Sequence, residues 1–263
     1  MKSDIKYNFR VTNSINFELF EQKSTATSNY EIEFEKLEAK NFKIEVRRNG
    51  FRINEKKIDL KFEKVAYEYQ KAIFPVLFDV KEGSFLLANF QEISDRISLK
   101  DEELSLQYEG HGFQYIRSQF LDNVAKDGYA MTNYFFSLGL MKVVMLCFQE
   151  TENLEQYQFQ WDIVPLETTL SWKGKGVLNS DTNILKYYGQ EAQTENLFEK
   201  IKAYGIANKY LQELSDQAAL ITTRVTNETQ FVTTKLDFER SETEIKINNP
   251  YFNYQEKLSI NRN

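Results

Sequence analysis

The sequence predicts an α+β protein with a large, curved antiparallel sheet, or two sheets, and about three helices packed on one face. Three observations lead to this prediction. Apolar and charged residues alternate through much of residues 7–90, which is typical of strands with one solvent-facing side. Short turn-like segments separate these runs, which favours hairpins and therefore antiparallel pairing. A middle stretch and one later stretch place apolar residues at helical spacing instead.

Apolar residues occupy every second position in the N-terminal strands. Ile44 and Val46, for example, alternate with Glu45 and Arg47. Alternation of this kind puts apolar side chains on one face of a strand and charged side chains on the other. The same pattern predicts further strands, at residues 7–11, 15–19, 32–35, 58–62, 65–69, 74–80 and 85–90.

Two sequence features indicate how these strands connect and where the sheet ends. Asn49-Gly50 supplies two residues that tolerate positive φ, so a tight hairpin turn is predicted there. Pro75 cannot donate a backbone hydrogen bond, so its strand is expected at a sheet edge or a bulge. Segment 243–247 is the second expected edge. Open edges of this kind pair with strands of partner proteins.

Helices are expected in the middle of the chain and again near residue 200. Apolar residues from Phe113 to Val124 are spaced as on one helix face, and a buried helix is predicted from about 130 to 140. The apolar run through Cys147 fits either more helix or a central strand, because periodicity does not separate the two. Thr194 is a suitable N-cap for a helix over 195–215. Later strands are expected at 157–163, 166–172, 177–188, 218–226, 230–238, 243–247 and 258–260.

The chain is expected to form one continuous globular body with two parts. Residues 1–150 would hold the N-terminal strands and the middle helices, and residues 151–263 a β-helix-β unit. Only three prolines and ten glycines occur, so no flexible linker is predicted between them. The order of strands, helix and strands occurs twice, but no residue-level repeat supports a duplication.

Composition argues against several classes of partner. The 263 residues carry 33 basic and 39 acidic side chains, and the two signs alternate along the chain. No basic patch is predicted, so nucleic acid is not an expected partner. A basic start without an apolar run, no stretch of membrane-spanning length and a single cysteine predict a cytoplasmic protein without a membrane span. Richness in Lys, Asn, Ile, Phe and Tyr favours a bacterial origin.

No combination of residues predicts catalysis. His111 lies between two glycines, where a general base could act, but it has no identifiable orienting partner and is interpreted as a surface turn residue. Cys147 lies among apolar neighbours and is interpreted as a small buried side chain. One histidine and one cysteine cannot form a zinc site. The sequence therefore predicts no catalytic residue, no metal site and no cofactor, and it leans against an enzyme.

The acidic clusters and the aromatic strands have structural interpretations. The acids at 31–35, 101–103 and 242–244 follow strand or helix periodicity, which is typical of a solvated face and not of a paired-carboxylate active site. Gly174-Lys175-Gly176 is interpreted as a hairpin turn, because a strand and not a helix follows it. Four aromatic residues could line a carbohydrate or lipid pocket but are interpreted as core: Trp161, Trp172, Tyr187 and Tyr188.

Two function classes stand ahead of an enzyme. The leading one is a non-catalytic protein–protein interaction protein, such as an adaptor, chaperone or assembly component, with a protein partner of unknown identity. The alternative is a binding module or carrier for an apolar small molecule or lipid, because a curved sheet closing on helices can enclose a cavity. Bulky helix side chains argue against a large cavity, since they would fill it. These side chains are Phe120, Leu121, Tyr134, Phe135, Leu138 and Met141.

Overall fold

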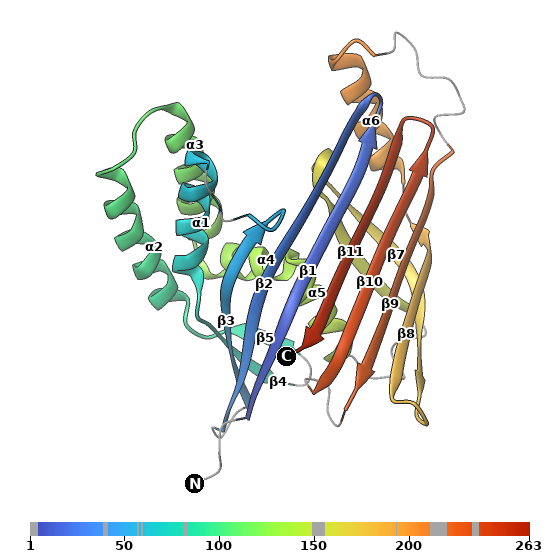
Figure 1. Ribbon diagram of the computed structural model, residues 1–263, viewed down its shortest axis with the longest axis horizontal. Coiled ribbons are helices and arrows are strands. Elements are labelled where there is room, and N and C mark those ends of the chain that lie inside the picture. The colour runs from blue at the N-terminus through green and yellow to red at the C-terminus, as the bar shows by residue number, and fades with distance from the viewer. Residues whose placement is uncertain are drawn as a thin grey trace. The chain divides into compact units, whose positions relative to one another are not determined.

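The computed structural model describes residues 5–38, 42–56, 58, 60–81, 84–148, 156–192, 194–210, 220–232 and 237–263. Within these residues the chain forms one antiparallel sheet of eleven strands, which is not closed, together with six α-helices (Figure 1). The predicted α+β class and the large antiparallel sheet are therefore confirmed.

The strands alternate with helices along the chain. The strands are β1 (Ile5–Leu19), β2 (Gln22–Glu38), β3 (Phe42–Ile53), β4 (Val76–Lys81), β5 (Ser84–Leu87), β6 (Tyr157–Ile163), β7 (Thr168–Asn179), β8 (Ile184–Ala192), β9 (Thr222–Phe231), β10 (Phe238–Asn249) and β11 (Phe252–Arg262). The α-helices are α1 (Lys61–Ile73), α2 (Phe90–Ser105), α3 (His111–Ser118), α4 (Gly128–Ser137), α5 (Gly139–Phe148) and α6 (Glu195–Ala207). A π-helix, η1 (Gln119–Val124), continues α3, and a 3-10 turn, η3 (Val164–Leu166), follows β6.

The sheet places the first and last strands of the sequence next to each other. The strand order is β5-β4-β3-β2-β1-β11-β10-β9-β8-β7-β6. At one end of this pair the amide of Asn263 donates to the carbonyl of Asn8 at 2.9 Å. The edges of the sheet are therefore β5 and β6, and both sequence predictions of an edge are wrong. Segment 243–247 lies in β10, which pairs with β9 and β11, and Pro75 precedes β4, which pairs with β3 and β5.

The chain divides into two compact units, each with its own core. Unit 1 comprises residues 1–10, 28–138 and 263, and unit 2 comprises residues 11–27 and 139–262. β1 and β2 each contribute residues to both units. The largest fully buried side chains include Phe9, Phe34 and Phe78 in unit 1 and Trp172, Tyr187 and Phe252 in unit 2.

Helix α1 lies where the sequence predicts strands at 58–62 and 65–69. Its buried residues are Val65, Tyr69, Ala72 and Ile73, which are three, four or one residue apart and form one helix face. Val65 and Tyr69 fit both patterns, because a spacing of four is even and also one helical turn. The flanking charges favour the helix, with an acid in the first turn and a base in the last.

Two predicted turns lie inside continuous strands. β3 runs through Asn49-Gly50, and its register with β2 shifts opposite this pair. Gly50 has a φ of 65°, as the sequence led us to expect. β7 runs through Gly174, where its register with β8 shifts as well. A glycine with positive φ serves a β-bulge as well as a hairpin, so the backbone conformation at Gly50 is predicted correctly and the chain reversal is wrong.

In unit 2 the sheet curls so that strands far apart in its order meet. The indole Nε1 of Trp161 in β6 donates to the Glu256 carboxylate in β11 at 2.6 Å, although β10, β9, β8 and β7 lie between these strands. Strands five steps apart in a flat sheet would be about 24 Å from each other. Two side chains cannot bridge that distance, so the sheet must curve.

Helix α5 lies against the inner face of this curl. Gly139 sits beside the Trp161 ring, where a Cβ would be 2.6 Å from the nearest ring carbon. Near the other end of α5, Cys147 Sγ is 3.9 Å from Thr229 Oγ1 of β9. The apolar run through Cys147 is therefore helix and not strand. No single helix within the described residues is long and apolar enough to span a membrane. Helices α4 and α5 reach that length and apolar character only when they are counted together, and the chain bends between them.

Candidate functional site

The residues that the sequence singles out for chemistry are placed in different settings. His111 is the exposed first residue of α3 in unit 1, and Cys147 is buried in α5 of unit 2. Trp161, Trp172 and Tyr187 are buried in unit 2, whereas Tyr188 is 41% exposed. Among the described residues, no group of three or more histidines, cysteines, aspartates or glutamates could hold a metal ion.

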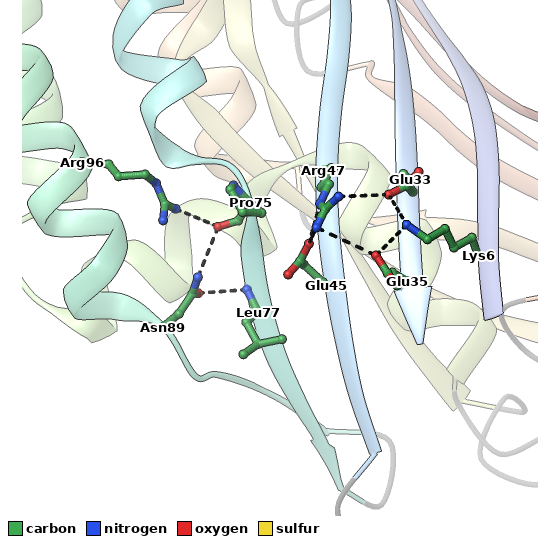
Figure 2. A network of polar contacts seen from close by, with 9 residues as sticks. All are labelled: Lys6, Glu33, Glu35, Glu45, Arg47, Pro75, Leu77, Asn89 and Arg96. Atoms are coloured by element: carbon green, nitrogen blue, oxygen red, sulfur yellow. Dashed lines mark hydrogen bonds and ion pairs between the residues drawn. The ribbon is translucent and has the colours of Figure 1, made fainter. Parts of the chain in front are cut away.

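Acids of β2 and β3 belong to an ion network in which most of the charge is compensated. Figure 2 shows Arg47 between three carboxylates, with Glu33 at 3.6 Å, Glu35 at 3.9 Å and Glu45 in closer contact. Lys6 of β1 also reaches Glu33 and Glu35, at 3.6 and 3.0 Å. Two cations face three carboxylates, so most of the charge is compensated and the network keeps one net negative charge.

A second polar group in Figure 2 fixes the chain before β4. Nη2 of Arg96 and Nδ2 of Asn89 both donate to the Pro75 carbonyl, at 2.7 and 3.2 Å. The Asn89 side-chain oxygen accepts from the amide of Leu77 at 2.8 Å. Arg96 also donates to the carbonyls that end α1, at Ala72 and Ile73. These bonds join α1, β4 and α2 and have a structural role.

Asp101 differs from the solvated face that the sequence predicts for the acids at 101–103. It is only 8% exposed, and it accepts two hydrogen bonds from Arg117 of α3, both at 2.8 Å. The Tyr69 hydroxyl of α1 donates to it at 2.6 Å. The hydrogen bonds from Arg117 are the main reason that the pKa of Asp101 lies below its ordinary value. The carboxylate therefore ties three helices of unit 1 together.

Large apolar side chains are exposed where the ends of these three helices meet. Leu60 precedes α1, Phe62 is in its first turn, Leu106 follows α2, and Tyr115 is in α3. We call these four residues the helix-end surface. Their exposed fractions are 66%, 58%, 89% and 67%, respectively. Soluble proteins rarely leave large apolar groups exposed together unless something binds there.

Contacts between the helices bring this surface together. A Cβ on Gly112 would lie 1.9 Å from the Phe62 ring, so Phe62 of α1 packs directly onto the backbone of α3. Gly112 and Tyr115 are three residues apart in α3 and share a face. On the α2 side, Lys61 Nζ lies 5.4 Å from the centre of the Tyr108 ring. Glycine at 112 is thus what allows the two helices to approach.

A groove of about 540 Å³ in unit 1 lies beside the helix-end surface, between β3, α1 and α2. Its aromatic wall contains Phe51 and Tyr67, whose rings stack with centres 5.8 Å apart, and Tyr108. Its charged residues include Lys100, which pairs with Glu68 at 3.8 Å and with Glu103 in closer contact. The groove therefore combines aromatic faces with charged residues, among them Arg52 and Lys64.

The sequence did not predict this region as a site. The sequence pattern predicts a strand at Leu60 and Phe62 and no helix at α2, so it does not predict that three helix ends meet here. The available signal was the run of large apolar residues on both sides of Gly110-His111-Gly112, which includes Leu106, Tyr108 and Tyr115. A glycine pair next to exposed aromatic residues is typical of close backbone packing.

Comparison with known proteins finds solved structures of similar shape but no family. No protein-family model matches the chain, and no curated protein matches it. A chain of the structure "Lipid-protein interactions in lipovitellin" is similar with a TM-score of 0.44 and 7% sequence identity. The alignment covers 98% of this chain and 25% of the lipovitellin chain, so the protein spans about a quarter of the length of that neighbour.

Proposed function

We propose that the chain is a non-catalytic binding protein that engages a protein partner through the helix-end surface of unit 1. The observation that carries the proposal is the exposure of Leu60, Phe62, Leu106 and Tyr115 on adjoining helix ends, at 58–89% of their full area. An adaptor, a chaperone and an assembly component would each use such a surface.

Energetics favour this use of the surface. Burying a large apolar side chain contributes roughly 1.5–3 kcal/mol, so four such groups can supply the core of an interface. Phe62 and Tyr115 are large and have few rotatable bonds, so little side-chain entropy is lost when a partner covers them. The neighbouring groove, with Phe51, Tyr67 and Tyr108, extends the apolar area.

The alternative, a carrier for an apolar small molecule or lipid, has less support from the geometry. In unit 2, α5 occupies the inner face of the curled sheet, and its residues Val143, Val144 and Leu146 are fully buried. The groove of unit 1 is open and mixes aromatic residues with charged ones. A lipid chain would need an enclosed apolar cavity.

Site-specific photocrosslinking tests the proposal. A photoreactive phenylalanine replaces Phe62 in one variant and Val177, a 54% exposed residue of unit 2, in the other. After irradiation in the native cell, the variant at 62 should yield a discrete crosslinked protein that the variant at 177 does not. That protein is then purified and its affinity for the chain is measured.

A matched pair of triple variants gives the control. Phe62→Ser, Leu106→Ser and Tyr115→Ser together should weaken the purified complex at least a hundredfold, about 2.7 kcal/mol. Val177→Ser, Leu220→Ser and Val232→Ser, which change exposed residues of unit 2, should leave affinity within about threefold. Equal losses in both variants would contradict the proposal. A reproducible lipid adduct in native mass spectrometry without a crosslinked protein would favour the carrier.

A further inference from the structure

Arg48 occupies a strand position where the sequence pattern calls for an apolar residue. Ile44 and Val46 of β3 are buried, and Arg48 is the next residue of the same parity. Its partner across the β2–β3 ladder is Ile32, which is 2% exposed. The charged side chain therefore points to the inner face of the strand pair.

Aromatic rings surround the Arg48 guanidinium. Its Cζ lies 4.8 Å from the ring centre of Phe74, 5.1 Å from Phe51 and 5.9 Å from Tyr30. Nη2 donates to the Gln70 side-chain oxygen at 3.1 Å. Ring faces stabilise a cation, and they also exclude water from it. Burial raises the pKa of Tyr30 to about 12, in keeping with a dry environment.

Arg48 has no carboxylate partner among the residues that the structure describes. The preceding residue, Arg47, differs in this respect, because three carboxylates surround its guanidinium (Figure 2). A guanidinium has five N–H donors, and the one described acceptor for Arg48 is an uncharged amide. Burial is the main cause that lowers the pKa of Arg48. Arg48 is half-buried, and a guanidinium that is partly withdrawn from water is normally paired with a carboxylate.

An uncharged groove of about 460 Å³ lies within unit 1 and is connected to Arg48 through two of its lining residues. Gln70, which lines the groove, accepts a hydrogen bond from the guanidinium. Tyr134, a second lining residue, interacts electrostatically with Arg48: burial raises the pKa of Tyr134, and the positive charge of Arg48 opposes this rise. The other polar lining residues are amides and one hydroxyl: Gln119, Asn123, Asn133 and Ser137.

The π-helix forms one wall of this groove. Gln119, Phe120, Asn123 and Val124 all belong to η1. A π-helical turn inserts an extra residue into a helix and is found frequently at functional sites, because it turns side chains toward a ligand. The amides of Gln119 and Asn123 bond to each other at 3.0 Å and leave further donors and acceptors for a ligand.

We infer that Arg48 and this amide-lined groove form a binding site for a small organic carboxylate. Aromatic rings lie against the guanidinium, so a ligand reaches its remaining N–H donors in the plane of the group. A planar carboxylate accepts two such parallel hydrogen bonds. The uncharged amides and hydroxyls of the groove would hold the polar remainder of the ligand without repelling an anion. This site is independent of the helix-end surface.

Benzoate and benzamide are the test probes, because they have nearly the same shape and differ in charge. Calorimetric titration of the full chain should show binding of benzoate at least tenfold tighter than that of benzamide. Arg48→Met should weaken benzoate binding at least tenfold, whereas Arg47→Met should change it by less than threefold. Thermal melts of both variants verify that they are folded.

A second variant keeps the test decisive if Arg48→Met does not fold. Asn133→Trp fills the groove from the exposed face of α4 without touching the guanidinium, and it should weaken benzoate at least fivefold. Equal affinity for benzoate and benzamide, no binding up to about 10 mM, or full binding by the Arg48 variant would overturn the inference. Inorganic phosphate binding more tightly than benzoate would overturn the assignment to carboxylates.

Discussion

Glu256 in unit 2 and Arg48 in unit 1 are both charged residues on inward-facing strand positions, but their surroundings differ. Glu256 is 4% exposed and accepts from Asn13 at 2.7 Å, from Trp161 at 2.6 Å and from the Tyr254 hydroxyl in closer contact. Arg48 meets aromatic rings and one amide oxygen. Glu256 is thus a buried charge with a full set of partners inside the fold, whereas Arg48 is a half-buried charge for which we infer a ligand.

The same contrast extends to the uncharged polar groups of unit 2. Asn227 and Thr229 of β9 and Ser241 and Thr243 of β10 are all buried, and they bond to one another at 2.7–3.1 Å. The donors and acceptors of these four side chains are thus used in hydrogen bonds within and between two neighbouring strands. Exposed apolar side chains do not separate the units, because unit 2 exposes several as well, among them Val164, Ile206 and Leu220. The contrast between the units therefore lies in how their inward-facing polar groups are paired.

The largest expected effect is at Glu256. Glu256→Ala leaves three donors, two of them buried, without an acceptor and should lower the free energy of unfolding by about 3–5 kcal/mol. Glu256→Gln keeps an acceptor oxygen and should cost about 1–2 kcal/mol. Urea denaturation measures both. Glu244→Ala, on the outer face of β10, is the control and should cost less than about 1 kcal/mol. Similar costs at 256 and 244 would break the comparison.

An intermediate effect is expected at Asp101, the paired carboxylate of unit 1. The pKa of Asp101 in the folded protein lies below its ordinary value, which is about 4 in the unfolded chain. The ionised side chain therefore stabilises the fold above about pH 4, and this stabilisation is lost as the pH falls through the folded-state pKa. Asp101→Asn should cost about 1–2 kcal/mol at pH 7, reduced because Arg117 is partly exposed. Below about pH 4 the parent should lose stability faster than the variant. Parallel pH curves would show that the pairing contributes nothing, and Glu102→Gln, at an exposed neighbour, is the matched control.

The smallest effect is expected on the helix-end surface. Leu106→Ser and Tyr115→Ser change side chains that are 89% and 67% exposed, so each should alter the free energy of unfolding by less than about 0.5 kcal/mol. Denaturant midpoints of the single variants and the parent test this. A decrease of more than about 2 kcal/mol in the free energy of unfolding would mean that these residues stabilise the fold, which would contradict their proposed role in binding a partner.

Local patterns in the sequence predicted the strands better than their arrangement. The alternation at Ile44 and Val46 identifies core positions, because it depends only on the period of a strand. The pairing of β1 with β11 joins segments at opposite ends of the sequence, and no local pattern encodes it. Gly50 indicates positive φ but not whether the strand turns or bulges.

The candidate sites were harder to predict than the fold. Arg48 has the parity of Ile44 and Val46, so the sequence does contain the signal of a charged residue on an apolar face. The surroundings of Arg48 depend on Gln70 in α1 and on Phe74 directly after it. The sequence pattern predicts strands where α1 lies, so it does not bring these residues to Arg48. The helix-end surface likewise depends on how three helices meet, which side-chain periodicity alone does not specify.

The pairing of β1 with β11 has a consequence for how the chain is made. β1 emerges from the ribosome well before β11, so one long side of β1 has no partner while the nine strands and six α-helices between them in the sequence are made. During that time an alternating, partly apolar strand has an unpaired edge, which is the kind of segment that associates with other nascent chains or with chaperones. Contacts between residues as distant as Asn8 and Asn263 also make folding slow. The ladder between β1 and β11 therefore cannot form until β11 has been made.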